Sequence, residues 1–124
     1  MKLLIVDDSN LIRTRIASVV ESTQMKGVTI VGLARNGLEA IKLAKQHKPD
    51  VVTMDLTMPE MDGVETIREL MTLNPPPNIL VVSALSDKST AIMALRLGAR
   101  GFINKPFTDK DLRAALLDVA DVTV

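Results

Sequence analysis

The chain has 124 residues, which predicts one domain over residues 1–124, large enough to bury roughly two-thirds of its unfolded surface without a disulfide or structural metal. Its 15 basic and 15 acidic residues cancel without any basic run, which argues against nucleic-acid binding by this domain. The chain has no cysteine, and its apolar stretches are too short for a signal-peptide core or for the ~20 residues of a membrane span, so we expect a cytoplasmic protein with no membrane partner.

The first predicted strand covers residues 2–6, which are mostly apolar and rich in β-forming side chains. Continuous apolarity over so few residues is typical of a strand covered on both faces. Ser9 or Asn10 can cap the helix that follows, and Arg13 and Arg15 lie off its apolar face. The apolar positions of this helix recur near helical spacing: Leu11, Ile12, Ile16, Val19 and Val20.

The second predicted strand covers residues 28–33, and the turn Asn36-Gly37 separates it from the next helix. That helix has one apolar side and stops before Pro49, because proline cannot continue a helix. Residues 51–54 form the third predicted strand. The order of elements so far is strand, helix, strand, helix, strand.

A loop over residues 55–63 leads into the third predicted helix, which the run 74–77 ends with three prolines. The fourth strand covers residues 79–82. The helix after it runs to Leu97, with Gly98 as its C-terminal stop.

Residues 101–104 form a short fifth strand, and Thr108 or Asp109 opens the last helix. This alternation predicts an α/β domain of (βα)5 organisation, with a five-stranded parallel sheet and helices on both faces. Right-handed crossovers place the carboxyl ends of the strands on one edge, which is where ligands of open α/β sheets bind.

Four of the apolar runs end abruptly in polar residues at that edge: Asp7-Asp8, Asp55, Ser83 and Lys105. If the first and third strands are neighbours, the three carboxylates lie close together, and like charges this close need a cation or a proton. Oxygen ligands favour a hard ion such as Mg2+. His47 is the only histidine and falls at a predicted helix end, which argues against a zinc site.

A carboxylate beside Mg2+ and an ammonium group is well placed to attack phosphorus, because both cations offset the charge on the transferring oxygens. Asp55 is the predicted nucleophile since it stands alone at a strand end, and Asp7 and Asp8 are the natural metal pair. Taken singly, each residue is more commonly a helix cap, a turn former or a solvated surface charge. Their convergence on one edge favours the phosphoryl-transfer interpretation.

With these motifs at these spacings, the chain resembles the receiver domain of bacterial response regulators, of the chemotaxis-regulator type, over essentially its whole length. The matching motifs are Asp7-Asp8, Asp55 within the run 54–63, Ser83-Ala84, Gly98-Ala99 and Lys105-Pro106-Phe107. The resemblance implies a single receiver domain with a flavodoxin-like sheet of order 2-1-3-4-5.

The resemblance also implies a role for each site residue. Asp55 is the phosphoacceptor, and Lys105 is the lysine that binds the phosphoryl group. Asp8 is the direct Mg2+ ligand, Asp7 assists through water, and Thr57 supplies a backbone carbonyl. Asp55 completes the metal set.

Two further residues match the positions through which the family switches. Ser83 matches the switch hydroxyl, and Phe102 matches the switch aromatic, which is often tyrosine in chemotaxis regulators. Phe102 has no phenol to report the switch by a hydrogen bond, so action on a flagellar motor is less strongly implied than receiver function. The bond Lys105-Pro106 is expected to be cis, and Thr57 and Leu85 match positions that tune phosphoryl lifetime.

The implied function is two-component signal transduction rather than turnover of an outside substrate. A sensor histidine kinase is the expected phosphodonor and Mg2+ the expected cofactor, and the domain catalyses only its own phosphorylation and dephosphorylation. Phosphorylation is expected to change the surface of the fourth helix, fifth strand and fifth helix. Because no effector domain precedes the end at Val124, we expect action by binding a downstream protein, as a monomer or weak homodimer.

The fourth helix carries a candidate interaction patch. Its sheet-facing side can be supplied by Ala91, Ile92, Ala94 and Leu95. That arrangement leaves Met93 and Leu97 partly outward, and we expect them to line a partner or dimer patch with Phe102.

Two other functions remain open. A non-phosphorylated interaction module on the same fold would show no response to Mg2+. A phosphatase or phosphotransferase would use the aspartyl-phosphate on outside substrates, and Asp55-Leu56-Thr57 superficially resembles the haloacid-dehalogenase nucleophile motif. That motif needs a second aspartate where Thr57 stands, and the chain has no cap insertion to bind a substrate.

Overall fold

Five strands and five helices alternate along the described part of the chain, as the sequence predicts. The computed structural model describes residues 1–22, 27–56, 62–84 and 88–121. In chain order the elements are β1 (Lys2–Val6), α1 (Asn10–Ser22), β2 (Thr29–Ala34), α2 (Gly37–His47), β3 (Val51–Met54), α3 (Gly63–Leu70), β4 (Asn78–Ala84), α4 (Lys88–Leu97), β5 (Gly101–Lys105) and α5 (Asp109–Asp121).

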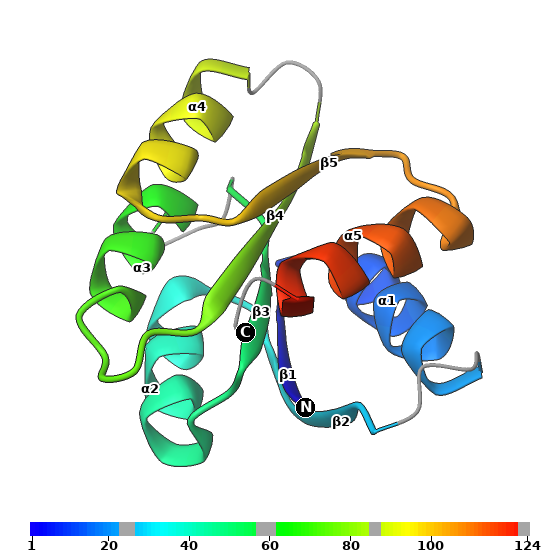
Figure 1. Cartoon of the computed structure of the whole chain (residues 1–124), viewed down its shortest axis with the longest axis horizontal. Helices are drawn as coiled ribbons and strands as arrows, with labels where there is room; N and C mark the ends of the chain where they lie inside the picture. The colour runs from blue at the N-terminus through cyan, green and yellow to red at the C-terminus, as the bar shows by residue number, and fades with distance from the viewer. Residues whose placement is uncertain (23–26, 57–61, 85–87, 122–124) are drawn as a thin grey trace.

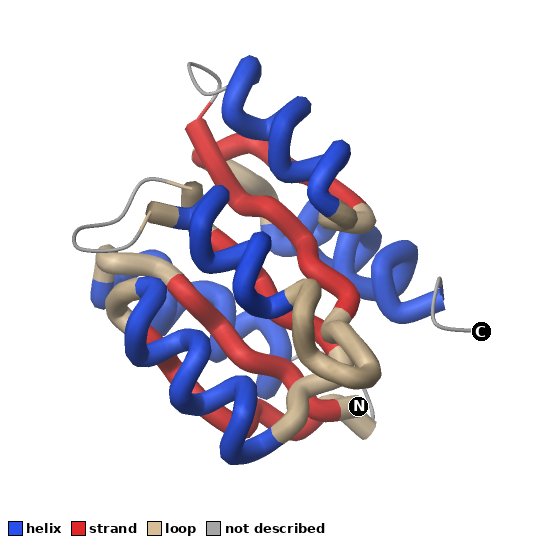
Figure 2. The backbone as a smooth tube through the Cα atoms, turned by 90° about the vertical axis from the view of Figure 1, so that its left-hand side faces the viewer, coloured by secondary structure: helices blue, strands red, loops and turns tan. Residues whose placement is uncertain are grey.

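All five strands run parallel in one sheet of order β2-β1-β3-β4-β5, which confirms the predicted α/β class and the flavodoxin-like order. Figure 1 shows α1 and α5 on one face of the sheet and α2, α3 and α4 on the other. In the turned view of Figure 2, these last three helices lie side by side in front of the strands. The carboxyl ends of the strands therefore meet at one edge.

The sheet separates two hydrophobic cores, because successive side chains of a strand point to opposite faces. Leu4 and Val6 of β1 join the core beneath α2, α3 and α4, whereas Leu3 and Ile5 join the core beneath α1 and α5. Every residue of β3 is buried as well. This two-sided burial accounts for the continuous apolar runs of the central strands.

The strands end differently from one another at the carboxyl edge. β3 ends as predicted, so Asp55 follows the strand, but β4 continues through Ala84 and β5 through Lys105. The β4–β5 ladder pairs Ser83 with Asn104. Ser83 and Lys105 are therefore fixed within the sheet rather than in a loop after it.

Short polar side chains cap the helices at the expected places. Ser9 Oγ and Thr108 Oγ1 cap α1 and α5 by accepting hydrogen bonds from main-chain N–H groups in the first turn, at 3.3 and 3.0 Å. Asn10 and Asp109, the other candidates, are instead the first residues of these helices. Gly98 has a φ of +124°, which only glycine adopts readily, and it ends α4 as predicted.

The apolar face of α1 differs from the prediction at two residues. Leu11 was expected in the core, but its first-turn position lies at the open edge of the sheet and it is 76% exposed. Arg13 was expected off the apolar face, but it is buried. Its guanidinium reaches main-chain and side-chain oxygens at the start of α1, which is why an arginine can occupy this position.

Helix α4 packs on the sheet through two small residues, Ala91 and Ala94. The large apolar side chains that it exposes are Ile92, Met93 and Leu95. The prediction that Ile92 and Leu95 face the sheet is therefore wrong, because the two alanines already fill that side. Met93 is exposed as expected, whereas Leu97 packs half-buried against the core.

Among the described residues, no helix is both long enough and apolar enough to cross a bilayer.

Candidate functional site

Three carboxylates gather at the carboxyl edge of β1 and β3. The two strands pair so that Val6 lies opposite Met54, and the main-chain N–H of Asp55 donates to the carbonyl of Val6 at 3.0 Å. The residues that follow both strands are thus neighbours. One carboxylate oxygen from each of Asp7, Asp8 and Asp55 lies within 4.8 Å of the other two.

The three carboxylates differ in their access to solvent. Asp7 and Asp55 are buried, with 1% and 5% of their surface exposed, whereas Asp8 is exposed. A set of oxygen donors at this spacing fits a hard divalent cation such as Mg2+, which is commonly held by one or two carboxylates and keeps several waters. The exposed Asp8 is the member that an ion arriving from solvent would meet first.

Lys105 supplies the positive charge of the site. Its Nζ lies 2.8 Å from Asp7 Oδ2 and 3.4 Å from Asp55 Oδ1. Among the described residues, this ion pair is the contact that holds the buried Asp7 Oδ2. Partial burial alone would lower the pKa of Lys105, but the two carboxylates outweigh it and raise this pKa.

Asp7 is held by hydrogen bonds at its N–H, its carbonyl and one of its carboxylate oxygens. Its N–H donates to the carbonyl of Ala34 at 3.1 Å, and its Oδ1 accepts from the N–H of Ser9 at 2.9 Å. Its carbonyl accepts from Nη1 of Arg13 at 2.6 Å. A buried carboxylate with this many partners has one position available to it.

A close approach of main chains holds Asp55 from the other side. The N–H of Gly63, at the start of α3, donates to the carbonyl of Leu56 at 3.0 Å. A Cβ on Gly63 would lie 2.4 Å from the carbonyl oxygen of Asp55. The glycine is needed here because no side chain fits between α3 and the segment after β3.

The segment after Lys105 is fastened to α1. The bond Lys105–Pro106 is cis, as predicted; Asn74–Pro75 is also cis and was not predicted. Arg15 donates through Nη2 to the carbonyl of Phe107 at 2.6 Å, and its guanidinium lies 4.7 Å from the centre of the Phe107 ring. Helix α1 thus contacts both the Asp7 side and the Lys105 side of the site.

The two expected switch residues share one face of the sheet. Ser83 is fully buried in β4, and Phe102 is half-buried in β5 opposite Val81. Because alternate residues of a strand share a face, Ser83 and Phe102 both lie on the side that α4 covers. Thr57 and Leu85 lie outside the described residues.

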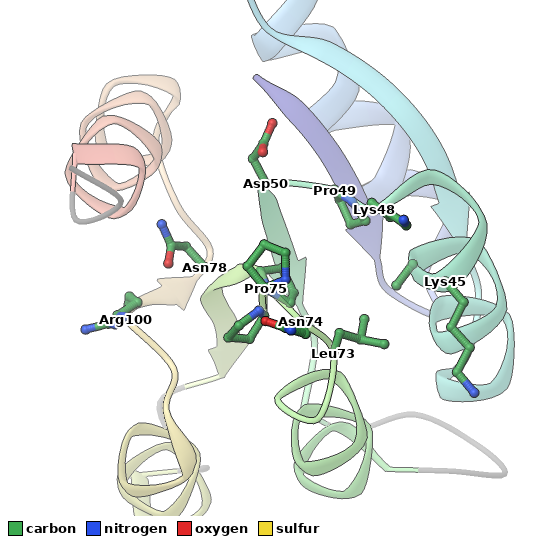
Figure 3. A pocket seen from close by; sticks show the side chains of 12 residues that line it. Lys45, Lys48, Pro49, Asp50, Leu73, Asn74, Pro75, Asn78 and Arg100 are labelled. Carbon is green, nitrogen blue, oxygen red and sulfur yellow. The ribbon is translucent and has the colours of Figure 1, made fainter.

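A cavity of about 510 Å³ lies at the opposite edge of the sheet. It is lined by residues at the amino-terminal ends of β3, β4 and β5 and by the proline run after α3. Figure 3 shows Pro75 and the Asn74 amide near its centre, while the charged ends of Lys45 and Arg100 point away on opposite sides. Without convergent charged groups, this cavity does not compete with the carboxylate cluster as the functional site.

Comparisons with known proteins agree with this geometry. A profile of the response regulator receiver domain matches residues 3–117. Chemotaxis protein CheY of Listeria monocytogenes is 42% identical over 115 residues, which are 92% of this chain and 94% of that protein. The protein-glutamate methylesterase/protein-glutamine glutaminase of Halalkalibacterium halodurans is 46% identical over 107 residues, which are 86% of this chain but 30% of that protein. The solved CheX-CheY-BeF3-Mg2+ complex of Borrelia burgdorferi aligns with a TM-score of 0.87 at 30% identity, over all of this chain and 90% of the matched chain.

Proposed function

This chain belongs to the response regulator receiver domain family, and from that membership we propose that it is a phosphorylation switch of two-component signalling. Residues 1–124 act as one receiver domain, and Asp55 accepts a phosphoryl group from the phosphohistidine of a sensor histidine kinase. The observation that carries the proposal is the buried Asp55 carboxylate, 3.4 Å from Lys105 Nζ and grouped with Asp7 and Asp8. A cysteine-free chain suits the reducing cytoplasm, where we expect the exchange to take place.

In phosphoryl transfer to Asp55, the main task of the protein is to position charged groups around the phosphoryl group. A carboxylate oxygen of Asp55 attacks phosphorus, the new O–P bond forms as the P–N bond to the donor imidazole breaks, and the released imidazole keeps the electron pair and takes up a proton. Asp7, Asp8 and Asp55, with the Thr57 carbonyl, would hold Mg2+, which supplies charge stabilisation for the transferring oxygens when bound. Lys105 lies beside Asp55, so its ammonium can form an ion pair with an oxygen of the phosphoryl group on Asp55.

The switch follows from what the phosphoryl group attracts. Lys105 and the Ser83 hydroxyl turn toward it, so Lys105 exchanges Asp7 for a phosphoryl oxygen. Movement of Ser83 leaves room for Phe102 on the same face, and the surface of α4, β5 and α5 changes. Such a two-state device needs only a few kcal/mol between its states, biased by the new contacts.

The test is the mass of the intact protein after incubation with acetyl phosphate and Mg2+. We expect a gain of one phosphoryl group in the wild type and none in Asp55→Asn, because the amide lacks the nucleophilic oxygen. Removing Mg2+ with a chelator should abolish the gain. An identical result for the wild type and Asp55→Asn would contradict the proposal.

The two other functions make different predictions in the same samples. A non-phosphorylated interaction module would show no Mg2+-dependent shift of backbone amide resonances near the carboxylates. A phosphatase acting on outside substrates would turn over p-nitrophenyl phosphate steadily, whereas a receiver transfers a phosphoryl group only to itself and then to water.

The output is a protein partner that binds the α4 patch, which consists of Ile92, Met93 and Leu95. These three side chains are between 43% and 54% exposed and lie on one helix. Large apolar side chains that a helix leaves exposed are candidates for a protein contact. The same patch could also form the contact of a weak homodimer. Among the proteins similar to this chain, CheY of Borrelia burgdorferi forms a complex with CheX.

A further inference from the structure

Arg13 is the buried basic residue of α1, with 8% of its surface exposed. Arginine is almost never buried to this extent without partners, because a guanidinium loses its hydration on burial. Among the described residues, the hydrogen-bond partners of the Arg13 guanidinium are two neutral oxygens. Nη1 donates to the Asp7 carbonyl at 2.6 Å, and Nη2 donates to Asn10 Oδ1 at 3.2 Å.

The two residues that accept these hydrogen bonds, Asp7 and Asn10, lie on either side of Asp8 in the sequence. Asp7 is the first residue after β1 and Asn10 is the first residue of α1, so the guanidinium spans the connection that contains Asp8. The main chain of Arg13 also donates to the carbonyl of Ser9 at 3.0 Å. One side chain and its own N–H therefore brace residues on both sides of Asp8.

The planar peptide bond carries this constraint to Asp8. The carbonyl of Asp7 and the Cα of Asp8 lie in one rigid plane. A hydrogen bond that fixes the direction of the carbonyl therefore fixes where the Asp8 side chain starts. Asp8 depends on this main-chain constraint more than Asp7 and Asp55 do, because it is the exposed member of the three carboxylates.

No carboxylate forms an ion pair with Arg13 within 4.0 Å in the residues that the structure describes. If Arg13 served only as a positive charge, its presence beside the three carboxylates would weaken the attraction of a divalent cation. A geometric role and an electrostatic role thus predict opposite effects of removing the charge on Mg2+ binding.

We propose that Arg13 is a positioning residue that holds the Asp7–Asp8 segment in the geometry required to bind a divalent cation. This inference rests on the proposed function, since it concerns the same cation site. It assigns to a buried arginine the task of orienting an exposed carboxylate through the main chain.

The experiment measures the dissociation constant of Mg2+ by calorimetry and by amide shifts of Asp8 in 15N-labelled protein, in the wild type, Arg13→Met and Arg13→Lys. We expect Arg13→Met to weaken Mg2+ binding about tenfold, in line with the loss of groups that orient metal ligands. Lysine keeps the charge but cannot span both oxygens, so we expect Arg13→Lys to weaken binding by a smaller factor. Arg96→Met removes an equal charge from an exposed position on α4 and should leave the constant unchanged.

Three outcomes would overturn the proposal. Tighter Mg2+ binding in Arg13→Met with wild-type binding in Arg13→Lys would assign Arg13 an electrostatic role. Unchanged binding by folded Arg13→Met, with a lower thermal midpoint, would assign it a purely structural role. If Arg13→Met does not fold, wild-type binding by Arg13→Lys would by itself overturn the proposal.

The failure of this inference can be told apart from the failure of the proposed function. A wild type that gains no phosphoryl group on Asp55 contradicts the function. A wild type that gains one, together with unchanged Mg2+ constants in both variants, contradicts only the role of Arg13.

Discussion

At the scale of single residues, two carboxylates of the site share one ammonium group, that of Lys105. Its ammonium lies between Asp7 and Asp55, and both carboxylates raise its pKa against the opposing effect of burial. A positive charge held in this way keeps two buried carboxylates close together before any metal or phosphoryl group arrives. The resting protein therefore already contains the electrostatic arrangement that a phosphoryl group would use.

The raised pKa of Lys105 makes this contribution to stability dependent on pH. Because the pKa of Lys105 in the folded protein lies above its ordinary value of 10.5, the stabilisation is fully present below about pH 10.5 and is lost as pH rises through the folded pKa. We expect Lys105→Gln to lower the free energy of unfolding by about 1–2 kcal/mol at pH 7–9 in the presence of a chelator.

The measurement is urea unfolding of the wild type and Lys105→Gln from about pH 7 to 11.5. Titration of the other lysines affects both proteins and cancels in the difference. We expect the difference to shrink above about pH 10.5. A difference that stays constant to the highest pH would show that the charge of Lys105 does not stabilise the fold.

The placement of the site residues was predictable only where the signal lies at a strand end. Asp7, Asp8, Asp55 and Lys105 follow or end apolar runs, and parallel strands bring such ends together. Arg13 lies three and seven residues before the buried Ile16 and Val20 and so shares their face of α1, but it was not predicted to be buried because arginine is normally a surface residue. Its burial depends on the Asp7 carbonyl and the Asn10 side chain, which hydropathy patterning does not describe.

At the scale of elements, the junction between β3 and α3 fixes Asp55 by a close main-chain approach. A Cβ on Gly63 would lie 2.4 Å from the Asp55 carbonyl oxygen and 2.5 Å from the Cα of Leu56. Both neighbours are main chain, so they cannot turn aside. We expect Gly63→Ala to destabilise the protein by about 1–3 kcal/mol and to slow phosphoryl uptake, because Asp55 is displaced.

The free energy of unfolding and the rate of adduct formation with acetyl phosphate are the two measurements for Gly63→Ala. Gly32→Ala is the matched control, since the atoms nearest to its Cβ would be side-chain ends, Leu4 Cδ1 and Leu43 Cδ1, both at 3.1 Å, rather than main chain. Stability within about 0.5 kcal/mol of the wild type for Gly63→Ala would contradict the proposed crowding.

The elements themselves were predicted well where burial is two-sided and less well where it is not. The central strand β3 has the predicted bounds, because its continuous apolar run admits only one interpretation. The orientation of α4 was mistaken, because Ala91 and Ala94 pack against the sheet and the larger Ile92 and Leu95 remain outside. A rule that buries the largest side chains fails where small residues allow a helix to lie close to a sheet.

At the scale of the whole molecule, the sheet separates the protein into two sides. Helix α1, on the side that it shares with α5, contacts Asp7 through Arg13 and the segment after β5 through Arg15. The other side carries Ser83, Phe102 and the α4 patch. The site and the proposed output surface are therefore connected through β4 and β5.

The α4 patch predicts a separable output defect. We expect Met93→Asp to leave the free energy of unfolding within about 0.5 kcal/mol of the wild type, because the side chain is exposed. We also expect it to weaken self-association and partner binding, since a carboxylate in an apolar contact loses its hydration.

Sedimentation equilibrium and capture of partners with the phosphorylated protein are the measurements. Thr14→Asp is the control, because it adds the same charge at an exposed position on α1, beyond the other face of the sheet. Unaltered self-association and partner capture by Met93→Asp would count against the α4 patch.

The placement of the two phenylalanines has a consequence for spectroscopy. The chain has no tyrosine or tryptophan, so its aromatic proton resonances come from Phe102, Phe107 and the single imidazole of His47. Phe107 is packed in the core beneath α1 and α5 under the Arg15 guanidinium, whereas Phe102 lies against the core beneath α4. Each side of the sheet therefore carries one natural reporter ring, and an unlabelled, unmutated sample can show the motion of one side while the other serves as its internal reference.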